Sequence, residues 1–229
     1  MKTTATVMQV SRSLLILTPA EYDKPEATIQ ISAKKNSVPI PTIFGAPQIF
    51  ELKDSLKDHP MQKADELAQF VKRCAESIGL NLGDVFVCIE DEDNVVSTEY
   101  THPAAKDKML PAYARVEAEK ILHGDIAQYT IIHSEYGYQF GKAKKNEDLQ
   151  AALFAMSSKT IADIRMEFEK EGIHVVKIIP PITALIHAGK QQMNSATKTV
   201  ALISLDFVAT RLVILHNGCL LYTSPSPRD

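Results

Sequence analysis

The chain lacks the features that mark several large classes of protein. Its 229 residues include three cysteines, Cys74, Cys88 and Cys219, which have neither metal-ligand spacing nor an even-numbered disulfide framework and so indicate a reducing compartment. No apolar run approaches the ~20 residues that a membrane helix needs, and polar residues interrupt the apolar stretch near the N-terminus, unlike in a signal peptide. We therefore expect a cytoplasmic protein that does not itself insert into a membrane.

The charge balance gives no support to a nucleic-acid-binding surface. The formal net charge is -3, the pI is about 6.2, and the basic residues are dispersed along the chain. The one dense basic group, Lys142, Lys144 and Lys145, is expected to lie in a solvated loop. The acidic run 90–93 is typical of a solvated turn, with a cation site as the less favoured alternative.

Motifs for metal or hydrolytic chemistry are missing as well. The seven histidines show neither HxxxH nor HExxH spacing, and no cysteine pair shows CxxC spacing, so no metal site is expected. Neither GxSxG nor GxxxxGKS occurs, so hydrolase and P-loop functions have no support. Cys74 and Cys88 fall within apolar patterns and are expected to be small core residues.

The sequence does contain an alternation of strand and helix patterns that is typical of an α/β fold. Helices are expected at 61–78, 108–122, 159–170 and 182–188, and residues 36–60, with four prolines, are expected to form an irregular connection with short extended pieces. Strands are expected at 7–10, 14–17, 28–33, 85–89, 95–100, 129–135, 153–156, 174–179, 200–205 and 211–215.

Apolar stripes predict which side of each helix faces the core. The stripe of the first helix is expected to be Ala64, Leu67, Val71, Cys74 or Ala75, and Ile78. In the helix at 108–122, an imperfect stripe of Met109, Ala112, Val116 and Ile121 is expected to face inward. In the helix at 159–170, the inward residues are expected to be Ile161, Ile164 and Phe168.

The last eleven residues, CLLYTSPSPRD at 219–229, can be back-translated codon by codon into a transposase-type sequencing adapter. We therefore expect this segment to be non-native and the natural chain to have been cut near Gly218. Cys219, Arg228 and Asp229 would then carry no function. The alternative is a Ser/Pro-rich disordered tail.

Two turns between apolar strands are the candidates for a ligand site. They lie at 9–13 (QVSRS) and at 204–210 (SLDFVAT). Many proteins use a small polar turn between two strands to direct backbone N–H groups at a phosphate. An ordinary hairpin is the alternative for each turn taken alone.

Taken in order, these features resemble the PilM family, the actin-like cytoplasmic components of type IV pilus machinery, and more distantly the division protein FtsA. The resemblance covers residues 7–218. It is carried by VMQVSRSLLIL at 7–17, VEAEKIL at 116–122, LFAMSSKTIADIRMEFEKEGIHVVKIIPPITALIHA at 153–188 and VALISLDFVATRLVILHNG at 200–218.

The resemblance implies an actin-like (ribonuclease H-like) first lobe with an inserted small α+β module. The lobe would comprise residues 1–95 and 181–218, the module residues 96–180, and a second lobe would follow beyond Gly218. ATP with Mg²⁺ normally lies between the lobes of such proteins, gripped by two Asp-Ile-Gly-type turns.

The two turns depart from the pattern that the resemblance implies. In the first turn, which ends in Arg12 and Ser13, the acidic position falls on Gln9 and the glycine position on Ser11. In the second, these positions fall on Ser204 and Asp206, while the threonine is kept as Thr210. Neutral oxygens are poor ligands for Mg²⁺, and the Asp206 carboxylate would repel phosphate. We therefore expect a pseudo-ATPase, without a cofactor in this chain, with ATP and Mg²⁺ as an alternative only for the full-length protein.

The resemblance implies a scaffold of a type IV pilus or type II secretion-like assembly. Its partners would be the N-terminal tail of an inner-membrane PilN-like protein, held beside the inserted module, and other pilus assembly proteins. The alternatives are an active actin-fold ATPase or sugar-kinase relative, and an FtsA-like division scaffold with a C-terminal membrane-binding helix.

Overall fold

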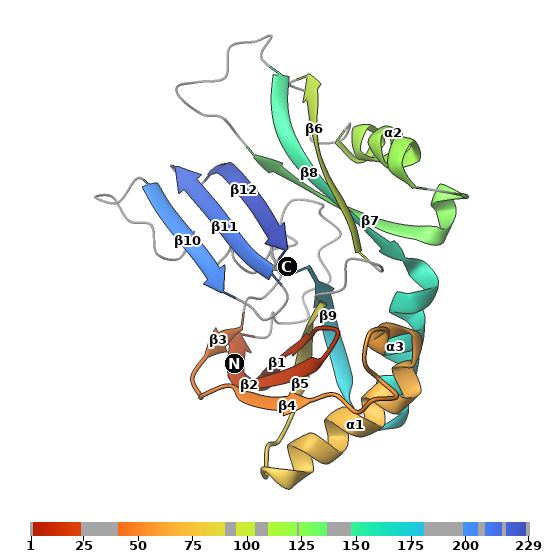
Figure 1. Ribbon diagram of the computed structural model, residues 1–229, viewed down its shortest axis with the longest axis vertical. Coiled ribbons are helices and arrows are strands. Elements are labelled where there is room, and N and C mark those ends of the chain that lie inside the picture. The colour runs from red at the N-terminus through yellow and green to blue at the C-terminus, as the bar shows by residue number, and fades with distance from the viewer. Residues whose placement is uncertain are drawn as a thin grey trace. The chain divides into compact units, whose positions relative to one another are not determined.

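In a computed structural model the chain forms two compact units. One comprises residues 1–90 and 160–179, and the other comprises residues 91–159 and 180–229. Figure 1 shows the elements of both. The structure describes residues 2–23, 41–89, 95–103, 110–122, 124–136, 148–180, 199–205, 209–216 and 219–227. The units divide the chain at places other than the expected module boundaries, because residues 160–179 group with the first unit.

The first unit contains a six-stranded mixed sheet with the strand order β3-β2-β1-β5-β9 and with β4 also paired to β2. β1 and β2 are antiparallel, whereas β5 and β9 extend the sheet in parallel from β1. The strands are β1 (Lys2–Val10), β2 (Leu14–Asp23), β3 (Thr42–Ile43), β4 (Gln48–Glu51), β5 (Asp84–Ile89) and β9 (His174–Ile179). The described strands confirm the α/β pattern, and β3 and β4 are the short extended pieces expected within 36–60.

Two helices accompany this sheet, α1 (Ala64–Ser77) and α3 (Ser158–Lys170), and they lie side by side in Figure 1. Lys72 of α1 and Glu171, just after α3, form an ion pair at 3.1 Å. Each helix leads into the next parallel strand in the same direction along the sheet, so right-handed crossovers place both helices on one face.

The predicted stripes of these two helices are largely confirmed. Leu67, Val71, Ile164 and Phe168 are buried, and so are the smaller residues of α1. Ile78 is an exception, since it is 40% exposed at the end of α1, where Gly79 turns the chain at a φ of 65°.

The two faces of the sheet differ in character. On the mixed face, Ala5, Ala20, Tyr22 and Phe86 form a buried cluster with Val7 and Val176 packed against it. This cluster includes no residue of α1 or α3, so we infer that the helices pack on the other face. That helix face carries residues that are at most 1% exposed: Met8, Val10, Leu15, Leu17, Val85, Val87 and Ile89.

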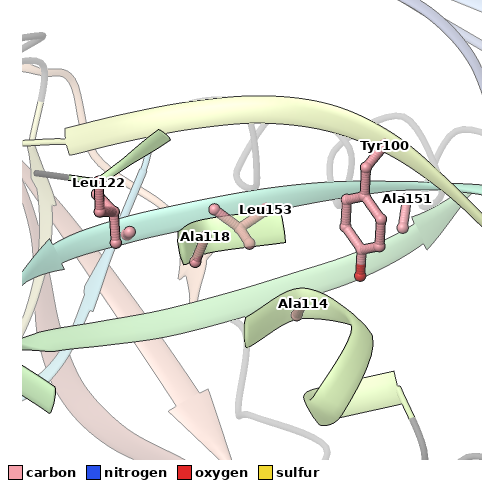
Figure 2. Close-up of a cluster of buried hydrophobic side chains, with 7 residues drawn as sticks. Tyr100, Ala114, Ala118, Leu122, Ala151 and Leu153 are labelled. Atoms are coloured by element: carbon pink, nitrogen blue, oxygen red, sulfur yellow. The ribbon is translucent and has the colours of Figure 1, made fainter. Parts of the chain in front are cut away.

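The second unit contains an antiparallel three-stranded sheet of order β6-β8-β7, with α2 packed on it. Its elements are β6 (Val95–Pro103), α2 (Leu110–Ile121), a 3₁₀ turn (Ile126–Gln128), β7 (Tyr129–Tyr136) and β8 (Asp148–Ser157). The core between helix and sheet consists of Tyr100, Ala114, Ala118, Leu122, Ala151, Leu153 and Ala155 (Figure 2).

The predicted stripe of α2 is wrong at Ala112 and Val116, whereas Ile121 packs against the core as expected and Met109 lies outside the described residues. Ala112 is exposed and Val116 is 53% exposed, whereas Ala114 and Ala118 are buried. Three further alanine and leucine side chains of β8 meet this helix face. The helix therefore approaches the sheet through methyl groups, and a stripe chosen for its larger apolar residues points to the wrong side.

A separate antiparallel sheet in the second unit has the order β10-β11-β12. Its strands are β10 (Thr199–Leu205), β11 (Ala209–His216) and β12 (Cys219–Pro227). The first two confirm the predicted hairpin, and Val213 and Leu215 are fully buried. Residues 219–227, expected above to be an adapter translation, pair with β11 from His216↔Cys219 onward.

Several predicted features lie outside the described residues. They are the strand at 28–33, the acidic run 90–93, the lysine group at 142–145 and the helix at 182–188. Among the helices that the structure describes, none combines the length and the apolar character required to cross a bilayer.

Candidate functional site

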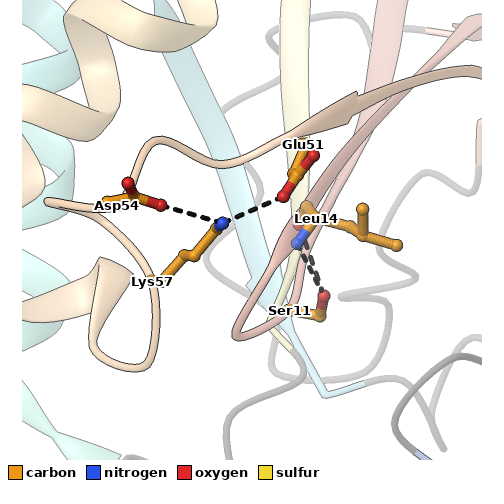
Figure 3. Close-up of polar contacts among 5 residues, drawn as sticks. All are labelled: Ser11, Leu14, Glu51, Asp54 and Lys57. Carbon is orange, nitrogen blue, oxygen red and sulfur yellow. Dashed lines mark hydrogen bonds and ion pairs between the residues drawn. The ribbon is translucent and has the colours of Figure 1, made fainter.

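The first candidate turn joins β1 to β2, and its own groups close it. Val10 pairs with Leu15, and the Ser11 N–H donates to the Leu14 carbonyl oxygen at 3.0 Å. The Leu14 N–H in turn donates to the Ser11 hydroxyl oxygen at 3.1 Å, as Figure 3 shows. Ser11 is 3% exposed, so this hydroxyl is part of the packed turn.

The backbone at Ser11 does not require glycine. Among the described residues Asp58 is the only non-glycine with a positive φ, so Ser11, Arg12 and Ser13 have ordinary backbone conformations. A serine at the position where the resemblance implies glycine therefore introduces no backbone strain. Its effect is steric and chemical, because a hydroxyl lies where glycine would let a ligand approach the backbone.

The segment that follows β4 holds the tip of this turn. The Leu52 N–H donates to the Ser13 carbonyl at 2.8 Å, and the Asp58 N–H donates to the Arg12 carbonyl at 2.9 Å. Leu52 and Leu56 anchor the segment, since they are 2% and 1% exposed. Asp58 makes its bond from a left-handed conformation, with a φ of 67°. Both tip carbonyls are thus occupied.

The charges beside the turn are not suited to an anion. The Lys57 ammonium lies 2.9 Å from one carboxylate oxygen each of Glu51 and Asp54 (Figure 3). These hydrogen bonds, that to Glu51 first, raise the pKa of Lys57. This ammonium is thus held by two carboxylates of the protein, and Glu51 pairs with Leu14 across β2 and β4. An ammonium held in this way is less available to a phosphate at the turn.

Gln9 lies half-buried on the mixed face, in register with Ile16 of β2 and Cys88 of β5. Its amide is neutral, as the sequence implied. Within the described ranges no three His, Cys, Asp or Glu side chains come together in a way that could hold a metal ion.

The second candidate turn lies between β10 and β11. Ser204 pairs with Arg211 and Leu205 pairs with Thr210, so Ser204 and Thr210 lie at the turn end of this hairpin, as predicted. Asp206 is outside the described residues. The two candidate turns belong to different units.

The two described cysteines are core residues, as expected. Cys74 and Cys88 are 7% and 6% exposed, and neither forms a disulfide within the described part of the chain. Burial raises the pKa of the Cys74 thiol, which keeps it protonated and unreactive.

Sequence patterns did not reveal two features that fix the first unit, one beside this turn and one at the far end of the β1–β2 hairpin. One is the segment from Leu52 to Asp58, which was expected only as part of an irregular connection. The other is the hydrogen bond from the Tyr22 hydroxyl to the Asp84 carboxylate, 62 positions apart in the chain. The only local signal was the tendency of Asp to adopt a positive φ, which applies to any aspartate in a loop.

Comparison with known proteins identifies the fold. A chain of the PilM-PilN type IV pilus biogenesis complex matches 97% of this chain with a TM-score of 0.69 at 15% sequence identity. The fold is actin-like. This confirms the fold expected from the resemblance to PilM, and the present chain spans 61% of the length of that matched chain.

Two other solved structures match with lower scores. One is a Bacteroides thetaiotaomicron protein with an actin-like ATPase fold and unknown function, with a TM-score of 0.49, 11% identity, and 98% and 70% of the two chains covered. The other is the cytoplasmic domain of EpsL, an inner-membrane component of the Vibrio cholerae type II secretion system, at 0.48, 7%, and 98% and 71%. No family model matches the sequence, and no curated protein does.

Proposed function

We propose that the chain belongs to a cytoplasmic PilM-like scaffold of a type IV pilus or type II secretion-like assembly. The observation that carries this proposal is the match to a PilM-PilN complex chain over 97% of the present chain. The match supports a PilN-like partner, and the resemblance to the PilM family implies that the contact is made by the N-terminal tail of such an inner-membrane protein. The scaffold lies at the inner face of the membrane through its partners, which include other pilus assembly proteins.

We further propose that the scaffold works without hydrolysing ATP. The first turn supports this, because the N–H groups of Ser11 and Leu14 and the tip carbonyls are engaged within the protein. The neutral side chain of Gln9 also disfavours Mg-ATP, and the Lys57 ammonium is already held by Glu51 and Asp54. The binding of an extended partner tail requires no such site, since backbone pairing and small pockets can recognise it.

Calorimetric titration with a partner peptide tests the scaffold function. The peptide would be the cytoplasmic N-terminal tail of the PilN-like protein encoded beside this gene, with a scrambled peptide of equal charge as the control. We expect saturable binding of the native peptide alone. Absence of binding to a chain extended to the full length of the PilM-type relative would overturn the proposal. Binding by that extended chain alone would mean that residues 1–229 are not a competent binder.

Titration of the same extended chain with Mg-ATP tests the pseudo-ATPase proposal separately. We expect no saturable binding below about 1 mM nucleotide and no phosphate release above background. Micromolar affinity would contradict the proposal and favour the active ATPase alternative. An actin-fold ATPase measured in parallel serves as the positive control.

A further inference from the structure

The β1–β2 turn contains an N–H group that could donate a hydrogen bond to an anion, and a side chain that already accepts this hydrogen bond. The Leu14 N–H is a backbone donor at the start of β2, in a strand–turn–strand arrangement suited to anion binding. It donates instead to the Ser11 hydroxyl oxygen at 3.1 Å. The same hydroxyl lies 3.4 Å from the Leu14 carbonyl oxygen. One serine side chain therefore closes the turn from within.

The geometry on the other side of the turn is also fixed without a ligand. The Arg12 and Ser13 carbonyls accept the N–H groups of Asp58 and Leu52. These two bonds tie the tip of the turn to the segment that follows β4. A bound anion would have to displace the Ser11 hydroxyl while the tip remained tied.

We propose that the Ser11 hydroxyl is a built-in substitute for an anionic ligand, an autoinhibitory contact that closes the β1–β2 turn to phosphate. The shape of this turn is then independent of ligand, so the turn cannot act as a nucleotide-dependent switch for the first unit. This inference deepens the proposed non-hydrolysing scaffold and rests on it for the role of the turn. Its test measures turn amides, so its failure is distinguishable from a failure of partner binding.

The chain offers a matched pair of serines for this test. Ser11 and Ser13 flank Arg12 in the same turn, and within the described residues the Ser13 hydroxyl makes no hydrogen bond, whereas Ser11 bonds Leu14. Ser11→Ala removes the hydroxyl that accepts from the Leu14 N–H. Ser13→Ala also removes one hydroxyl, but it leaves that hydrogen bond in place. Ser11→Thr keeps the hydroxyl oxygen and serves as the rescue variant.

The measurement is amide hydrogen exchange at Leu14 in the ¹⁵N-labelled chain. We expect slow exchange in the wild type and in Ser13→Ala, exchange faster by about tenfold in Ser11→Ala, and recovery in Ser11→Thr. Equal exchange rates in Ser11→Ala and the wild type would overturn the proposal.

A second measurement needs no variant. Inorganic phosphate and Mg-ATP are each titrated into the wild-type chain while the amide shifts of Ser11 and Leu14 are followed. We expect both amides to stay unchanged to about 10 mM of either ligand. A saturable shift with phosphate would show an open anion site and overturn the proposal, and a shift with Mg-ATP alone would overturn it in favour of a nucleotide site.

Discussion

The two faces of the six-stranded sheet are built differently. The helix face is dominated by apolar side chains that are almost completely buried, such as Met8, Leu17 and Val87. The mixed face combines a small apolar cluster with polar groups, among them Tyr22, Gln9 and Lys177, which is in register with Phe86. The two faces therefore differ in role. The helix face supplies most of the apolar burial that stabilises the unit, while the mixed face carries polar side chains whose contribution to stability depends on hydrogen bonding and pH.

The largest effect is expected on the helix side. Phe168 of α3 is 0% exposed, so Phe168→Ala should destabilise the protein by about 4 kcal/mol through lost burial and the cavity left behind. Met166 lies on the same helix and is 51% exposed, so Met166→Ala should cost less than about 1 kcal/mol. Urea denaturation followed by circular dichroism measures both. Similar losses would mean that α3 does not pack through Phe168.

The next largest effect concerns the edge where β5 begins beside β1. Gly83 has a φ of 56°, and a Cβ there would lie 2.8 Å from the Thr4 carbonyl carbon. Gly83→Ala should therefore cost more than about 3 kcal/mol, from backbone strain and from the forced separation of the two strands.

Gly79→Ala is the matched control for this substitution. Gly79 has a φ of 65° with open space around a Cβ, so only the backbone strain of about 1–2 kcal/mol should appear. The difference between the two variants in urea denaturation isolates the close approach to Thr4. Equal costs would show that the strands can separate freely at this point.

The mixed face should show its polar character in a smaller and pH-dependent effect. The Tyr22 hydroxyl donates to Asp84, and the Tyr22 ring meets Phe86 edge-on with centroids 5.1 Å apart. Burial first, and then the bond to Asp84, raises the pKa of Tyr22 to about 12. Tyr22→Phe should cost about 1–2 kcal/mol at neutral pH, because Asp84 loses a donor.

The sign of the pH dependence follows from the raised pKa. The folded state favours the protonated phenol, so the contribution of Tyr22 is complete below pH 10 and is lost as the pH rises towards 12. The stability difference between the wild type and Tyr22→Phe should therefore shrink across this interval. A difference that stays constant from pH 9 to 12 would contradict the role of the hydroxyl.

The same contrast explains how much the sequence could predict. Helices α1 and α3 were predicted correctly because large residues such as Leu67 and Phe168 recur at helical spacing and are the buried ones. The stripe of α2 was wrong at Ala112 and Val116 because the buried contacts there are made by Ala114 and Ala118, and alanine carries little signal in an apolar pattern. Helix existence follows from periodicity, whereas the buried side depends on the partner surface.

The candidate site shows the same limit. The sequence placed the first turn between β1 and β2, and it identified Gln9 and Ser11 as departures from the expected pattern. It could not show that the Ser11 hydroxyl bonds Leu14 or that Asp58 holds Arg12. Those contacts depend on backbone φ angles and on the path of the proline-containing connection at 36–60. Both are determined only when the chain is folded.

The smallest expected effect has the opposite sign and again lies on the mixed face. Lys177 is half-buried, and within the described residues no hydrogen bond or ion pair to its ammonium is found; burial lowers its pKa. The folded state therefore disfavours the charged form, so stability rises as the pH rises through the lowered pKa towards 10.5. Lys177→Met should stabilise the protein at pH 7 by about 0.5–1 kcal/mol, and this gain should vanish above pH 10.5.

Lys170→Met provides the control, because Lys170 is 59% exposed and pairs with Glu167, so its removal should bring no gain. Urea denaturation at pH 7 and pH 11 measures both variants. If Lys177→Met destabilises the protein at both pH 7 and pH 11, the aliphatic stem of Lys177 packs better than methionine does. The mixed face would then be stabilised mainly by apolar contacts, like the helix face. If the gain appears at pH 7 alone, the charge itself is the cost, and the two faces differ in chemistry as their side chains indicate.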